Sequence, residues 1–120
     1  MANTKLDTLW AKAVKENAGN KCEYCGKTEY LNAHHIFTRV NRSTRWDLEN
    51  GICLCAGHHM LNSRFSAHGT PLIFADWIRD MRGEKWYKSL RKRADTLVKL
   101  TKSDLLRIEQ ELIGATGRSR

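Results

Sequence analysis

The sequence predicts a small α+β domain in which a cysteine-bearing hairpin lies between an N-terminal helix and several C-terminal helices. The opening residues carry apolar positions at helical spacing, and residues 20–65 contain short strand-like runs separated by polar loops. The second half returns to helical patterns with clear start signals. A length of 120 residues fits one domain. We therefore expect one unit over 1–120, with a core at 20–82 and a helical extension at 84–114.

The first expected element is an amphipathic helix over about residues 6–16. Its apolar side chains share one face: Leu6, Leu9, Trp10 and Val14. Asn3 or Thr4 has the side-chain oxygen that an N-cap requires. We expect this helix to cover the core.

Two short antiparallel strands should follow, at residues 30–37 and 51–55, after a C-x2-C knuckle. A polar loop with three arginines joins them. Residues 56–65 favour a helix, and Thr70-Pro71 begins another, because proline suits the first helical position; that helix should stop near Gly83.

The last two expected helices differ in charge. A basic helix over 84–100 has apolar positions that include Trp86, Leu90, Leu97 and Val98, with Lys85, Lys88, Arg91, Lys92 and Arg93 on its exposed side. Thr101 and Asp104 resemble a capping box that opens a final helix ending at Gly114. The tail GATGRSR should fray.

The overall charge favours a polyanionic partner. Twenty-one Lys and Arg against thirteen Asp and Glu give a formal net charge of +8. No run of about 18 apolar residues exists, so we expect no membrane association and a location in the cytoplasm. In that reducing compartment, four cysteines are metal ligands more often than disulfide partners. A redox role for the C-x2-C pair would need a βαβ context that the sequence lacks.

Ligand spacing predicts a structural zinc site. Cys22 and Cys25 supply half of a tetrahedral set, and Cys55 and His58 repeat the same spacing in CLCAGHH. Cys53 is the competing ligand, but a C-x-C pair is a less usual zinc chelate than C-x2-H, so we expect Cys53 in the core.

The remaining histidines need another explanation, because four protein ligands close a structural zinc site. His34, His35, His59 and His68 are left over. Adjacent residues on a strand point to opposite faces, so His34 and His35 cannot simply bind one ion side by side. They can divide the work: one binds a metal and the other faces a water nucleophile.

The ordered series of these motifs resembles the HNH family of nucleases. The matching stretches are AHHIF with its two histidines, RWDLENGICLC with Asn50, and AGHHMLN with His59. The resemblance spans residues 22–77, and SAHGTPLIFADW looks like the continuation in phage-type members. It implies a ββα-metal core around the zinc knuckle, flanked by the N-terminal and C-terminal helices.

The resemblance also implies roles for the site residues. His34 and His59 would bind the catalytic metal, and His35 would be the general base, for which a pKa near 6.5 is suited. Asn50 would steady the loop and orient His35. A third ligand is usual one turn beyond His59, where this chain has Ser63. His68 therefore stands as the alternative third ligand, with Asn62 weaker.

A one-metal mechanism follows from the resemblance. The ion would stabilise charge on the scissile phosphate while His35 activates water, leaving 3′ hydroxyl and 5′ phosphate ends. Imidazole ligands suit Mn²⁺, Ni²⁺, Co²⁺ or Zn²⁺ better than Mg²⁺.

The resemblance implies double-stranded DNA as the partner, contacted by loop arginines and by the basic helix. The candidates are Arg42 first, then Arg39 and Arg45, with Lys88, Arg91 and Lys92 further out. For Arg39 and Arg45, a role as solvated loop residues is an equal alternative, and for the basic helix the alternative is a solvated helical face. Two non-catalytic alternatives remain: a zinc-stabilised DNA-binding module, and an interaction module of phage packaging or recombination machinery in a bacterial host. We expect a monomer or a weak dimer.

Overall fold

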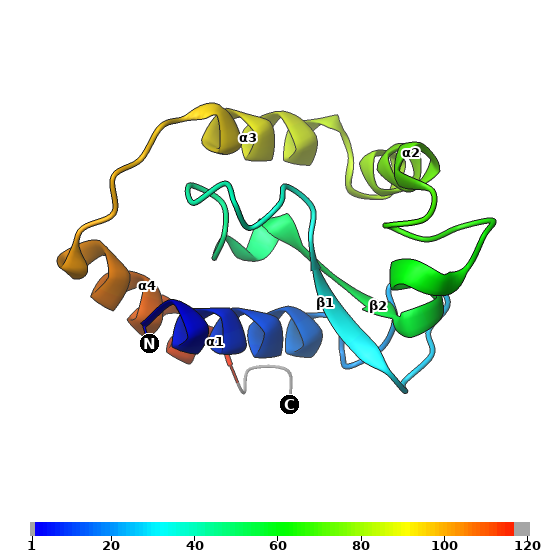
Figure 1. Cartoon of the computed structure of the whole chain (residues 1–120), viewed down its shortest axis with the longest axis horizontal. Helices are drawn as coiled ribbons and strands as arrows, with labels where there is room; N and C mark the ends of the chain where they lie inside the picture. Colours follow the sequence, from blue (N-terminus) through cyan, green and yellow to red (C-terminus); the bar gives the residue numbers. More distant parts are fainter. Residues whose placement is uncertain (1, 117–120) are drawn as a thin grey trace.

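We describe the fold from a computed structural model in which residues 2–116 are described. The elements in order are α1 (Ala2–Asn17), β1 (Leu31–His35), η1 (Leu48–Asn50), β2 (Gly51–Cys55), η2 (Gly57–Leu61), α2 (Pro71–Arg82), α3 (Glu84–Asp95) and α4 (Lys102–Ala115). Figure 1 shows the hairpin of β1 and β2 between α1 with α4 on one side and α3 on the other. The predicted α+β class is confirmed. Among residues 2–116, no helix has the length and apolar character needed to cross a bilayer.

The two strands pair antiparallel, and their register places the histidines. His34 is paired with Ile52, and His35 with Gly51. Every residue of β2 is buried, whereas β1 is half-buried throughout. The strand that carries both histidines is therefore the more accessible one.

The strand β2 separates two apolar clusters. Ile52 and Leu54 belong to a cluster with Phe74 and Ile78 of α2. Cys53 belongs to a second cluster. This cluster contains three residues of α1 (Leu6, Trp10 and Val14), Trp46 of the loop between the strands, and Leu112 of α4. Alternation along a strand accounts for this division. The predicted covering role of the first helix is confirmed.

The observed ends of α1 and α4 can be compared with the capping residues that the sequence suggested. The helix α1 begins at Ala2, so Thr4 lies inside its first turn rather than at the cap, and the side chain of Asn3 lies outside the described part. The capping box of Thr101 and Asp104 is confirmed, and α4 ends one residue later than expected. Of the tail expected to fray, residues 117–120 lie outside the described range.

Two predicted helices are shorter than expected. The helix α3 ends at Asp95 instead of continuing to residue 100, and Leu97 is 98% exposed. Leu97 packs against no apolar surface of the described residues, so a further helical turn at this point would bury nothing. The apolar spacing alone therefore predicted too long a helix.

Only one π-helical turn, η2, occupies the segment 56–65. The side-chain oxygen of Asn62 accepts hydrogen bonds from the backbone N–H groups of Arg64 and Phe65 at 2.8 and 3.0 Å. These side-chain hydrogen bonds take backbone N–H groups that a longer helix would use, so the helical turn ends and the chain bends back.

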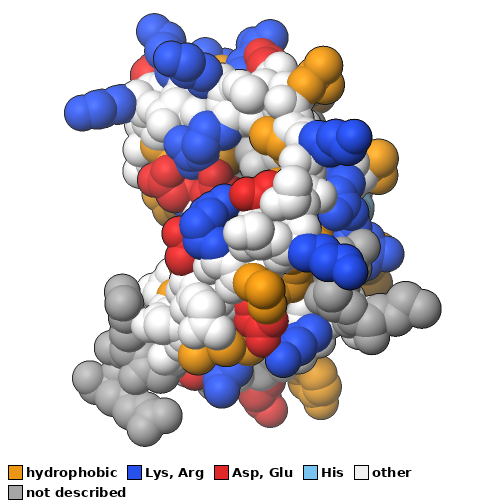
Figure 2. Space-filling model, turned by 90° about the vertical axis from the view of Figure 1, so that its left-hand side faces the viewer, with side chains coloured by type: hydrophobic (Ala, Val, Ile, Leu, Met, Phe, Trp, Pro, Cys, Tyr) orange, Lys and Arg blue, Asp and Glu red, His pale blue; other side chains and the backbone are white. Residues whose placement is uncertain are grey.

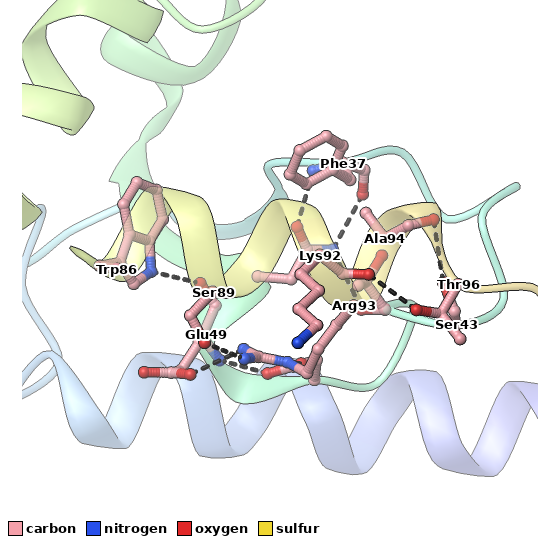
Figure 3. A network of polar contacts seen from close by, with 12 residues as sticks. Phe37, Ser43, Glu49, Trp86, Ser89, Lys92, Arg93, Ala94 and Thr96 are labelled. Atoms are coloured by element: carbon pink, nitrogen blue, oxygen red, sulfur yellow. Dashed lines mark hydrogen bonds and ion pairs between the residues drawn. The ribbon is translucent and has the colours of Figure 1, made fainter. Parts of the chain in front are cut away.

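The segment 38–49, which we call the arginine loop, is held from two sides. On one side, Asp7 of α1 pairs with Arg45. On the other, Arg93 of α3 donates to Asp47 and Glu49 at 2.6 and 2.7 Å, as Figure 3 shows from the side of α3. Arg93, which we expected on the exposed side of its helix, is half-buried, and its guanidinium is paired with these two acidic side chains.

Figure 3 also shows the end of α3 against the same loop. The carbonyl oxygen of Ala94 accepts a hydrogen bond from Ser43 at 3.3 Å and one from the amide of Asn41 at 2.8 Å. The last turn of a helix leaves such carbonyl groups without helical partners, so the loop satisfies them. The loop is consequently fixed to α3 through backbone as well as charge.

Candidate functional site

The first cysteine pair lies on a tight turn. The backbone N–H of Gly26 donates to the carbonyl of Cys22 at 2.8 Å, and the N–H of Cys22 donates to the carbonyl of Lys27, also at 2.8 Å. Gly26 has φ of 80°, which only glycine adopts without strain. This turn directs both thiols toward the end of β2.

Four predicted zinc ligands come together there. The ligand atoms of Cys22, Cys25, Cys55 and His58 all lie within 4.8 Å of one another. The sulfurs of Cys25 and Cys55 are 3.8 Å apart, and Nδ1 of His58 lies 3.3 and 3.9 Å from the sulfurs of Cys55 and Cys22. A tetrahedron with Zn–S bonds of about 2.3 Å has S···S edges of about 3.8 Å. The Cys3His cluster thus fits a zinc knuckle.

Cys53 lies outside this cluster and differs from Cys22 in the acidity of its thiol. Burial opposes ionisation of Cys22, but backbone hydrogen bonds around Cys55 and Cys25 outweigh it and lower the pKa of Cys22 to about 6. Burial, with a contribution from the nearby Glu23, raises the pKa of Cys53 to about 11. Cys53 is fully buried and packs in the apolar cluster of Trp10, so its position assigns it to the core.

A second cluster joins His34, His59 and His68, whose ligand nitrogens also lie within 4.8 Å of one another. Nε2 of His59 faces Nε2 of His68 at 3.1 Å, and the ring of His34 lies 5.1 and 5.0 Å from their rings. Burial lowers the pKa of His34 to about 3, with contributions from His59 and His68. Burial likewise lowers the pKa of His59. Neutral imidazole is the form that binds a metal.

The returning chain explains how His68 reaches this cluster. The backbone N–H of His68 donates to the carbonyl of His59 at 3.0 Å, and that of Ala67 donates to the carbonyl of His58 at 2.9 Å. The turn at Asn62 thus lays the segment alongside η2. Asn62 itself is engaged in that turn. His68 follows His59 by nine residues, yet the turn brings it as close to His59 as a residue one helical turn away would be.

His35 has a separate environment on the opposite side of β1. Its Nε2 lies 2.9 Å from the carbonyl oxygen of Arg45. A carbonyl oxygen only accepts, so Nε2 carries the proton and Nδ1 keeps its lone pair. The ring stacks on Trp10 with centroids 3.7 Å apart and planes 7° from parallel. Burial lowers the pKa of His35, and the hydrogen bond to the Arg45 carbonyl partly offsets this lowering.

The side chain of Asn50 steadies the loop, as expected, but its amide bonds the loop backbone and not His35. Its amide nitrogen donates to the carbonyl oxygens of Phe37 and Thr44 at 2.9 and 3.0 Å, and its oxygen accepts from the N–H of Phe37 at 2.7 Å. The side chain is fully buried and fastens both ends of the arginine loop. Its contribution to His35 is therefore the position of the loop.

The predicted DNA contacts differ in how free their charges are. Arg39 and Arg42 are exposed, and the guanidinium of Arg42 lies 5.5 Å from the ring centre of Trp46. Arg45 is paired with Asp7 at 2.7 Å. On α3, Lys88, Arg91 and Lys92 are exposed. Figure 2 shows the face at the ends of α3 and α4, where Lys and Arg side chains dominate the upper part and one edge.

The comparison with protein families supports the resemblance for part of the chain. Residues 22–68 match the family model described as HNH endonuclease. The matched segment contains the Cys3His cluster, the three-histidine cluster, His35 and Asn50. The proteins of this family are nucleases that act on DNA, so the match suggests nuclease activity for this segment. No curated protein and no solved structure matches the chain.

The contacts of α1 with the HNH segment were not anticipated from the sequence. Trp10 was expected only in the core, and Asp7 was not considered. Asp7 accepts hydrogen bonds from Arg45 and from Nε1 of Trp46, which lower its pKa although partial burial opposes this. A tryptophan on an aliphatic helix face carries no signal of such a neighbour. Only the register of β1 against α1 reveals it.

Proposed function

We propose that the chain is a metal-dependent DNA endonuclease with His35 as general base and a divalent ion held by His34, His59 and His68. The observation that supports this most directly is the second cluster, of three histidines, separate from the Cys3His cluster. A protein that only bound DNA would need the zinc knuckle but not these histidines. The knuckle is assigned a structural zinc ion.

The proposed chemistry divides between the ion and the protein. A divalent ion at the three histidines would supply charge stabilisation for the phosphate and the departing 3′ oxygen. His35 takes a proton from the attacking water at Nδ1, because Nε2 is committed to the carbonyl of Arg45. The proton bound there is then released to solvent, and the products carry 3′ hydroxyl and 5′ phosphate ends.

The donor set guides the choice of metal. Three imidazole nitrogens are borderline ligands, which favour Mn²⁺, Co²⁺, Ni²⁺ or Zn²⁺ over Mg²⁺. Nε2 of His59 and Nε2 of His68, 3.1 Å apart, are separated by about the distance expected between two nitrogen ligands of one such ion. We therefore expect the transition metals to give the higher rates.

Phosphate contacts are assigned to the exposed cations, of which Arg91 also pairs with Asp95 at the surface of α3. Arg42 and Arg39 are exposed on the arginine loop, and Lys88, Arg91 and Lys92 are exposed on α3. Arg45 is a weaker candidate because Asp7 already neutralises it. Binding of this kind positions the duplex through its backbone and is largely tolerant of sequence.

The test of the proposed function is plasmid cleavage. Supercoiled plasmid incubated with the protein and Mn²⁺ is expected to give nicked or linear DNA, and a chelator should prevent this. Binding without cleavage in any divalent metal would contradict the proposal and favour the DNA-binding module. Neither binding nor cleavage would favour an interaction module of phage machinery in the bacterial cytoplasm.

Replacing His68 with alanine is expected to weaken binding of the catalytic metal. The change removes one of three nitrogen ligands, while the Cys3His cluster keeps all of its own. The Mn²⁺ concentration for half-maximal cleavage should rise at least about tenfold, since even outer-shell partners of metal ligands contribute that much.

Ser63→Ala provides the control for His68→Ala. Ser63 is exposed in the same returning segment and belongs to neither ligand cluster. It should show the parent metal dependence. An unchanged metal dependence in His68→Ala would remove His68 from the ligand set.

A further inference from the structure

The side-chain torsion that sets the plane of an imidazole ring is soft. Rotation about the bond between Cβ and the ring is broad rather than confined to staggered wells. A histidine that must present one nitrogen to a water therefore needs two kinds of contact. One fixes the plane of the ring, and the other fixes the direction in which each ring nitrogen points. Around His35, both kinds of contact come from outside β1.

The plane of His35 is set by Trp10 of α1. The two rings are 3.7 Å apart and within 7° of parallel. Trp10 is itself held firmly: it is 1% exposed, and its Nε1 donates to the carbonyl oxygen of Asp47 at 2.9 Å. The indole is thus a rigid surface on which the imidazole lies flat.

The strand opposite leaves room for this stack. His35 is paired with Gly51 across the hairpin. A Cβ atom at position 51 would lie 2.8 Å from Cζ2 of Trp10 and 2.4 Å from Cγ2 of Val14, closer than real Cβ contacts. Only glycine lets α1 approach the hairpin at this point. The close approach brings Trp10 against the ring of the proposed base.

The direction in which the ring nitrogens of His35 point depends on α1 as well. The carbonyl oxygen of Arg45 accepts from Nε2, and the Arg45 side chain is fixed to Asp7 by hydrogen bonds at 3.0 and 2.7 Å. Asp7 and Trp10 are three residues apart, on one face of α1. A single helix therefore supports both contacts that define the orientation of the imidazole.

We propose that α1 is a working part of the nuclease site, in which Trp10 is a positioning residue that holds His35 in the orientation needed to take a proton at Nδ1. The inference rests on the proposed role of His35 as general base. It goes beyond the matched HNH segment, because α1 precedes residue 22. Residues 22–68 alone would hold the ligands without the surface that orients the base.

The test compares Trp10→Ala with Trp10→Phe. Loss of the stack should lower the single-turnover cleavage rate constant by about 100-fold, as small misplacements of a catalytic group do, while the Kd for a short duplex changes little. Trp10→Phe keeps an aromatic surface and should retain most of the rate. It also guards against failure of the alanine variant to fold.

Leu6→Ala is the matched control. Leu6 is 2% exposed, lies on the same helix and belongs to the same apolar cluster as Trp10. It should lower thermal stability but leave the cleavage rate near that of the parent. A parent-like rate in Trp10→Ala, or an equal loss in Leu6→Ala, would overturn the proposal.

A second readout does not require activity. The carbon-bound protons of the His35 ring lie over the indole and should show an upfield ring-current shift in NMR spectra. This shift should be lost in Trp10→Ala and largely kept in Trp10→Phe. Unchanged His35 resonances in Trp10→Ala would overturn the positioning role. If the parent protein cuts no DNA, the proposed function fails, and the ring-current shift still decides the placement of His35.

Discussion

Replacing His35 with alanine is expected to abolish plasmid cleavage while leaving DNA binding nearly intact. The loss should be about 10²- to 10⁴-fold in the cleavage rate, the usual contribution of a positioned general base. Binding should persist because the exposed arginines and lysines of the arginine loop and α3 keep their charges when the imidazole is removed. Single-turnover cleavage and a duplex-binding titration measure the two effects separately.

Chemical rescue sharpens this experiment. The alanine variant leaves a space between Trp10 and the carbonyl of Arg45, into which free imidazole fits. Added imidazole should restore part of the rate in His35→Ala but should not stimulate the parent protein. Asn32→Ala, a change on the same strand, is the control and should cut normally. Cleavage by His35→Ala at the parent rate would show that another group is the base.

Replacing Cys25 with alanine is expected to remove zinc and unfold the region around the knuckle. The sulfur of Cys25 lies 3.8 Å from that of Cys55, so the change removes one of four ligands. Structural zinc binding is worth about 10–16 kcal/mol in isolated zinc fingers, comparable with the whole stability of a small domain. We expect the zinc content to fall by one equivalent and the Tm to drop by more than about 10 °C.

Cys53→Ala is the matched control for Cys25→Ala. Cys53 is completely buried on the same hairpin but packs in the cluster that contains Trp10 and lies outside the ligand set. Its replacement should keep the zinc and cost only about 1 kcal/mol of stability. A full complement of zinc and a normal melting curve in Cys25→Ala would exclude the Cys3His site.

Local signals in the sequence predicted most of the ligand geometry. The spacing of Cys22 with Cys25 and of Cys55 with His58 fixes short turns whose shape depends only on nearby residues. The alternation of His34 and His35 is a property of any strand. These expectations needed no knowledge of distant parts of the chain, and the structure brings the four zinc-ligand candidates together as expected.

Long-range contacts were beyond the reach of such reasoning. The stack of Trp10 on His35 joins residues 25 positions apart, and the contact between Arg93 and Asp47 spans 46. Arg93 has the same spacing pattern as its exposed neighbours on α3, so nothing local distinguishes it. The partners of Asn50 were missed for the same reason: Phe37 and Thr44 follow from the path of the loop.

The packing of α1 against α4 has a consequence for the order of assembly. Leu6 near the start of the chain and Leu112 near the end share one apolar cluster. Contacts between such remote positions form late, because the chain entropy lost in closing so long a loop must be offset first. The knuckle closes over a separation of only 36 residues. A growing chain can therefore bind its zinc ion well before the final helix emerges to complete the fold.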